Sequence, residues 1–109
     1  MTSKLRMSDI KIEALDWSPW LDFNRDNITA IAESEGVYKM HAAMKILFVG
    51  SSENIRQSLF DCLSNPCISK AERFSYAMSQ SSYKVREQLL NEYRNRHNGR
   101  LPRCMEQEH

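Results

Sequence analysis

Three side chains in this sequence could take part in acid–base or electrostatic chemistry: the phenol of Tyr38, the guanidinium of Arg56 and the carboxylate of Glu87. A phenol donates or accepts a hydrogen bond, a guanidinium binds anions through several N–H donors, and a carboxylate accepts hydrogen bonds. Taken singly, none is unusual. Tyr38 fits either core or surface, Arg56 can pack its stem along a helix flank, and Glu87 lies off the apolar stripe of its predicted helix, where carboxylates are usually solvated.

The element that would position these groups is a predicted β-hairpin that runs directly into a helix. Residues 36–40 and 45–49 are short runs rich in β-formers and apolar residues, and their short connection predicts antiparallel pairing. A helix follows the second strand and carries the arginine. We therefore expect Tyr38, Phe48 and Arg56 to lie close together, although the sequence separates them.

Capping residues and apolar periodicity predict the remaining elements. The helices expected are one from Arg25 to about Ala32 after an Asn24 cap, one capped by Ser51 or Ser52 with Ile55, Leu59, Phe60 and Leu63 as its buried stripe, and one from about Tyr83 to His97, begun by Ser82 and ended by Asn98-Gly99. A third strand is expected over Arg73–Met78. The fold class predicted is α+β, with a small three-stranded antiparallel sheet flanked by helices.

The order of short motifs along the chain resembles that of the GIY-YIG nuclease family. The matching segments are Gly36-Val37-Tyr38, then after nine residues Phe48-Val49-Gly50, then Arg56, Arg73-Phe74-Ser75-Tyr76, Glu87-Gln88-Leu89-Leu90 and Leu101-Pro102-Arg103-Cys104. The resemblance implies one domain overall. Residues 36–105 form its GIY-YIG-like part, 1–35 an N-terminal arm and helix packed on it, and 106–109 a tail.

The resemblance also implies an activity, namely hydrolysis of nucleic-acid phosphodiesters by an endonuclease that depends on Mg²⁺ or Mn²⁺. In that reading Glu87 holds the metal, Arg56 neutralises charge on the phosphoryl oxygens, and Tyr38 positions or deprotonates the attacking water. Nucleic acid is the expected partner, DNA ahead of RNA. The residues expected to contact this substrate are Phe48, Gly50, Ser51 and Arg86.

Three positions depart from the family pattern. Phe48 stands where the family has its second tyrosine, Ser51 where many members have a lysine, and Met105 where an asparagine is expected. Loss of a general-base hydroxyl costs about 10²–10⁴-fold in rate. Two interpretations follow: a weakened endonuclease, or a catalytically degenerate GIY-YIG fold that binds nucleic acid or a protein through the same face. A structural adaptor that uses the Trp17/Trp20 arm is a third.

The charge of the chain is unevenly distributed. Residues 1–35 hold four basic and seven acidic side chains, whereas residues 36–109 hold eleven basic and seven acidic ones. The segment 84–103 alone has six basic and two acidic residues. This surplus is either a solvated helix face or a surface for a polyanion. Trp17 and Trp20 lie in the acidic part, where they are expected to cover one side of the core, with base stacking as the alternative.

The composition is that of one small globular domain, with 109 residues, 41% hydrophobic and 27% charged. The odd number of cysteines predicts free thiols at Cys62, Cys67 and Cys104 and no zinc site. No apolar run is long enough for a membrane span, and no signal peptide is recognisable, so a cytoplasmic location is expected. A chain of 109 residues is expected to have no separate targeting domain, so any sequence specificity would have to come from a protein partner or a homo-oligomer.

Overall fold

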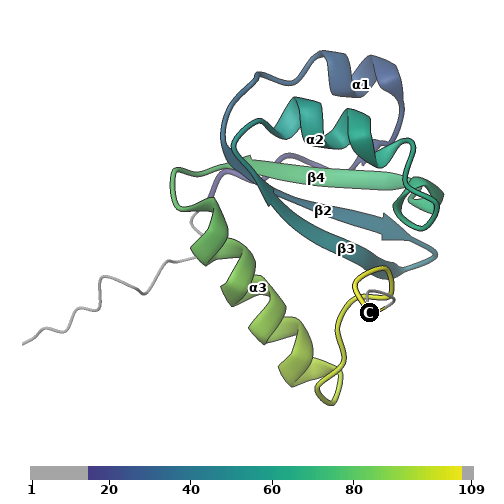
Figure 1. Cartoon of the computed structure of the whole chain (residues 1–109), viewed down its shortest axis with the longest axis vertical. Helices are drawn as coiled ribbons and strands as arrows, with labels where there is room; N and C mark the ends of the chain where they lie inside the picture. Colours follow the sequence, from purple (N-terminus) through teal and green to yellow (C-terminus); the bar gives the residue numbers. More distant parts are fainter. Residues whose placement is uncertain (1–14, 107–109) are drawn as a thin grey trace, which may run out of the picture.

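The computed structural model describes residues 15–106; residues 1–14 of the predicted arm and 107–109 of the predicted tail lie outside the described part (Figure 1). The fold is α+β, as predicted. Its elements in chain order are β1 (Leu21–Asp22), α1 (Arg25–Thr29), β2 (Gly36–Ala42), β3 (Lys45–Ser52), α2 (Ile55–Cys62), the short 3₁₀ helix η2 (Ile68–Lys70), β4 (Arg73–Met78) and α3 (Ser82–Arg96).

The sheet has four antiparallel strands in the order β1-β4-β2-β3. The three predicted strands are confirmed, but the prediction of a three-stranded sheet is wrong. Leu21 and Asp22 add a fourth strand at one edge by pairing with Phe74 and Arg73. Periodicity cannot reveal a strand of two residues, because two positions do not define an alternation.

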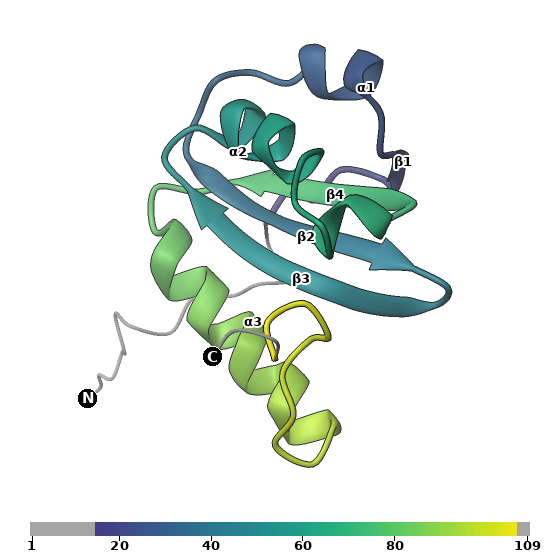
Figure 2. The ribbon, with the colours of Figure 1, turned by 45° about the vertical axis from the view of Figure 1, so that its right-hand side comes forward.

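The helices are divided between the two faces of the sheet. Alternate residues of β2 point to opposite faces, so Tyr38 and Met40 pack in the cluster that contains residues of α1 and α2, whereas Val37 packs against Val85 of α3. Figures 1 and 2 show α1 and α2 on one side of the sheet and α3 on the other, next to β3. Within residues 15–106, no helix has the length and apolar character needed to span a membrane.

The β2–β3 hairpin turns through only two residues, Ala43 and Met44, with φ angles of 52° and 68°. Positive φ at both positions is the requirement of a type I′ turn, in which Asn-Gly is preferred. A left-handed conformation costs about 1–2 kcal/mol for a residue with a Cβ. Pairing between β2 and β3 begins directly beside the turn, at Ala42 and Lys45. The hairpin therefore forms because this pairing offsets the cost of the turn.

Asparagines cap the two shorter helices. The Asn24 side chain accepts a hydrogen bond from the backbone of Asn27, as predicted, although α1 ends at Thr29. Asn54, and neither Ser51 nor Ser52, caps α2. The two serines remain paired in β3, which runs three residues further than the apolar pattern indicated.

The α2 stripe and the ends of α3 follow the prediction in part. Ile55 and Leu59 are fully buried. The long helix begins one residue earlier than expected, and the Ser82 hydroxyl donates to Glu35 instead of capping it. Gly99 has a φ of +85° and ends the helix region in the left-handed conformation that was predicted.

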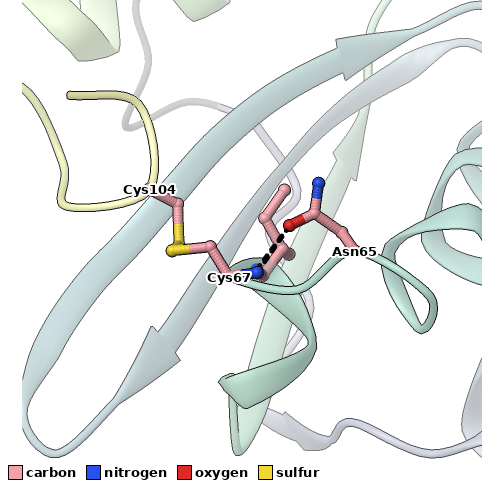
Figure 3. Close-up of a disulfide and its surroundings, with 4 residues drawn as sticks. Asn65, Cys67 and Cys104 are labelled. Atoms are coloured by element: carbon pink, nitrogen blue, oxygen red, sulfur yellow. Dashed lines mark hydrogen bonds between the residues drawn. A yellow bond between two sulfur atoms is a disulfide. The ribbon is translucent and has the colours of Figure 1, made fainter. Parts of the chain in front are cut away.

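The prediction of three free cysteines is wrong for two of them. Cys67 and Cys104 form a disulfide across a sequence separation of 37 residues (Figure 3). Cys62 remains a free, buried thiol. The C-terminal segment reaches Cys67 because it runs back along β3, where the Cys104 N–H donates to the Leu47 carbonyl at 2.9 Å. An odd cysteine count requires at least one free thiol, but it says nothing about the other two.

Breaking this disulfide should lower the free energy of unfolding by about 4 kcal/mol, because the link restricts a long loop in the unfolded chain. The measurement is denaturant unfolding with and without reductant, with Cys62→Ala as the matched control that leaves the disulfide intact. Thiol titration of the unfolded, unreduced protein should find one reactive group. Three reactive groups before reduction would contradict the disulfide. The predicted cytoplasmic location stays a prediction.

Candidate functional site

The centre of the candidate site is Tyr38, in the middle of β2 between Gly50 on β3 and Tyr76 on β4. Its ring lies directly over Gly50. A Cβ at position 50 would come within 2.4 Å of the Tyr38 Cζ and 2.5 Å of its hydroxyl oxygen, and within 2.8 Å of the Phe48 ring. The glycine is therefore required for close approach, and Tyr38 extends across the edge strand of the sheet.

The Tyr38 hydroxyl is enclosed by side chains of α2. Ser58 and Cys62 both hydrogen-bond with it, and Ser58 also donates to the Ser52 hydroxyl at 2.6 Å. Tyr38 is only 5% exposed. Burial, together with the neighbouring Cys62, raises the pKa of Tyr38 well above its ordinary value, while Ser58 and Arg86 act in the opposite direction. The phenol is thus protonated and packed at neutral pH.

Arg56 lies on the other flank of α2. Its guanidinium forms an ion pair with Glu33 and donates to the Thr29 carbonyl of α1 at 3.4 Å. Two residues correspond to about 200° around an α-helix, so Arg56 points away from the side on which Ser58 meets Tyr38. Arg56 therefore points toward α1, where the Glu33 carboxylate and the Thr29 carbonyl accept hydrogen bonds from its guanidinium.

Arg86 is the cation whose charge acts on the Tyr38 hydroxyl. It comes from α3, which packs on the opposite face of the sheet but lies mainly against β3, the strand that Tyr38 crosses. Its Nη1 contacts the Glu87 Oε2 at 2.9 Å. Two of the predicted site residues, Arg86 and Glu87, are therefore paired with each other beside the Tyr38 edge of the sheet.

The remaining predicted residues of the site line the same strand. The Phe48 and Tyr38 rings lie with centroids 6.1 Å apart, and Phe48 is partly buried against the larger core cluster. Gly50 is buried beneath the Tyr38 ring, whereas Ser51 pairs with Val37 and so belongs to the opposite face of the sheet. Phe48 contributes packing here and no proton-transfer group.

The predicted metal site offers a divalent ion one protein carboxylate, that of Glu87. Across the described range 15–106, no group of three or more His, Cys, Asp or Glu side chains is arranged to hold an ion. Glu87 is a single carboxylate, and one of its oxygens already accepts from Arg86. A magnesium ion prefers oxygen ligands in octahedral geometry, so it would have to displace Arg86 and take its other ligands from water and substrate.

Sequence reasoning missed Ser58 and Cys62, the two side chains that meet the Tyr38 hydroxyl. They lie four residues apart and hence on one face of α2, beside the stripe of Ile55 and Leu59. That spacing is the signal that could have found them. Neither residue was predicted to meet Tyr38, because the predicted buried face of the helix was based on its apolar residues alone.

The predicted tryptophan cover is confirmed for Trp17, which packs against the smaller core cluster. Trp20 is 42% exposed. The Lys39 ammonium lies 4.2 Å from the Trp17 ring and 5.7 Å from the Trp20 ring. Burial lowers the pKa of Lys39, and the charge of Glu92 opposes that effect. Lys39 of β2 thus makes cation–π contacts with both tryptophan rings.

No protein-family model matches the chain, and no curated protein matches it.

The protonated cluster at Tyr38 and Cys62 should make the fold sensitive to alkali. Burial raises the pKa of Cys62 from 9.0 to about 11, and that of Tyr38 rises in the same direction. A raised pKa means that the folded state holds the proton more tightly than the unfolded state. The stabilisation is complete below about pH 9 and is lost as the pH rises toward 11.

Urea unfolding across this range should show a loss on the order of 2 kcal/mol from Cys62 alone. Cys62→Ala should flatten the profile up to about pH 11, and Tyr38→Phe should flatten the part above pH 10. A free energy of unfolding that is independent of pH over this range, or that rises, would contradict the buried thiol–phenol pair.

Proposed function

We propose that this chain is a small, divergent GIY-YIG-like domain that binds nucleic acid and has lost robust nuclease activity. The observation that carries the proposal is the environment of the two predicted catalytic groups on β2 and α2. Arg56 is bound to Glu33 on one flank of α2, while Ser58 and Cys62 are the α2 residues that meet Tyr38. A hydrolytic site needs its cation beside the reacting phosphate, and this arginine is held elsewhere.

Three further features argue against efficient hydrolysis. Tyr38 is buried and its pKa is raised, so its phenol is a poor group for accepting a proton from water at neutral pH. Phe48 supplies no second hydroxyl. The Glu87 carboxylate is partly neutralised by Arg86 before any metal or phosphate arrives.

The alternative is a weakened Mg²⁺- or Mn²⁺-dependent endonuclease. It is favoured by the position of Arg86 and Glu87, since both lie on the helix whose positive charge acts on Tyr38. In this alternative, binding of a phosphate would draw Arg86 away from Glu87 and free the carboxylate. The two possibilities differ in whether Glu87 matters for cleavage.

Nucleic acid is the proposed ligand because the basic surplus is concentrated in residues 36–109, which hold eleven basic and seven acidic side chains. Binding that depends on cations and phosphates weakens steeply with salt. We propose DNA ahead of RNA, and a protein partner or a second copy of the chain as the source of any sequence specificity.

The test is a cleavage and binding assay on single-stranded, duplex and branched substrates of DNA and RNA, with Mg²⁺ or Mn²⁺. The wild type should bind in a salt-sensitive manner and cleave no faster than Glu87→Gln, which serves as the control for contaminating nuclease. Phe48→Tyr and Phe48→Tyr/Ser58→Arg test whether a restored hydroxyl and a cation facing Tyr38 bring back hydrolysis.

Metal-dependent cleavage by the wild type that disappears in Glu87→Gln would overturn the proposal in favour of the endonuclease. Absence of binding to every substrate at low salt would reject nucleic acid as the ligand. Cleavage that appears only with the added tyrosine and arginine would support a degenerate site.

A further inference from the structure

A groove of about 890 Å³ lies away from Tyr38, at the end of the sheet where the hairpin turns. Three segments that are distant in sequence form it: the β2–β3 turn, the connection between α2 and β4, and the C-terminal segment. We call it the disulfide groove, because Cys67 and Cys104 are part of its wall. Its lining residues are Ala42, Ala43, Lys45, Leu47, Asn65, Pro66, Cys67, Lys70, Arg103 and Cys104.

The charge of the disulfide groove is of one sign. Lys45, Lys70 and Arg103 are exposed and come one from each segment, and the lining contains no aspartate or glutamate. Among the ion pairs of residues 15–106, none involves these three side chains. Arg56 and Arg86, by contrast, each have a carboxylate partner. Three such cations around one hollow create a positive potential that favours an anion.

A neutral donor adds to this set. The Asn65 Oδ1 accepts hydrogen bonds from the backbone N–H groups of Cys67 and Ile68, at 2.8 and 2.9 Å. These two bonds fix the orientation of the amide, so its NH₂ group points away from them, as Figure 3 shows. Amide and ammonium donors of this kind are common partners of phosphate oxygens in nucleic-acid complexes.

The disulfide holds the two sides of the groove in place. It ties Cys104, next to Arg103, to Cys67, which lies three residues before Lys70 (Figure 3). Pro102 is fully buried and the Cys104 N–H is bonded to Leu47, so the segment that carries Arg103 is anchored on both sides of that residue. Groups held in position before binding lose less conformational freedom when a ligand arrives.

We propose that the disulfide groove binds the phosphate groups of a nucleic-acid strand, and that its grip depends on the Cys67–Cys104 link. This inference rests on the proposed function, which it locates at the hairpin end of the sheet and not at Tyr38. The groove supplies cations and a fixed amide donor from three segments, and it has room for several phosphate and sugar groups of a strand.

The experiment measures affinity for a labelled single-stranded DNA and its RNA counterpart over a salt series. The variants are Lys70→Gln, Arg103→Gln and the double change, with Arg25→Gln as the matched control, since Arg25 is an exposed arginine of α1 outside the groove and outside the basic part of the chain. Each single groove variant should weaken binding roughly three- to tenfold at about 50 mM salt and lower the salt slope by about 0.7, and the double variant should lower the slope by about 1.4. The control should change affinity by less than about twofold, since a distant cation contributes only a screened long-range term.

Reduction of the disulfide in the folded protein should weaken binding in the same direction, with circular dichroism confirming that the fold persists. Wild-type binding that Lys70→Gln/Arg103→Gln leaves unchanged would overturn this inference while the proposed function stands. Equal losses in Arg25→Gln and in the groove variants would also overturn it, because the contact would then be diffuse. If the wild type binds neither strand at low salt, the proposed function fails, and this inference with it.

Discussion

The packing of the Tyr38 ring over Gly50 is the contact on which the arrangement of the site depends. The ring fills the space that a side chain at position 50 would occupy, with its Cζ only 2.4 Å from the place of a Cβ. From there its hydroxyl reaches Ser58 and Cys62 and joins the hairpin to α2. In this position Tyr38 is almost fully buried.

The packed site at Tyr38 and the disulfide groove lie apart in the fold. The groups that surround the phenol are a hydroxyl, a thiol and an arginine that is already paired with Glu87. Around the disulfide groove, by contrast, Lys45, Lys70 and Arg103 take part in none of the ion pairs found within residues 15–106. The nucleic-acid surface that we propose therefore lies at the hairpin end of the sheet and not at Tyr38.

Local patterns predicted most of the secondary structure, because strand alternation and asparagine capping act within a few residues. The sequence could not predict which way Arg56 turns, since that depends on Glu33, a residue of the α1–β2 connection that becomes a neighbour only in the folded chain. The disulfide was missed for the same reason. Cys67 and Cys104 meet because the chain returns along β3 after α3, and no local feature of either cysteine reports that path.

A double-mutant cycle between Gly50→Ala and Tyr38→Leu tests the central claim most directly. In the wild type, the added methyl should cost about 1–3 kcal/mol of unfolding free energy because it meets the end of the tyrosine ring. With the shorter leucine the cost should fall by about 1 kcal/mol or more, and Ser51→Ala should show no such coupling. An equal cost of Gly50→Ala in both backgrounds would contradict the claim that Tyr38 over Gly50 organises this site.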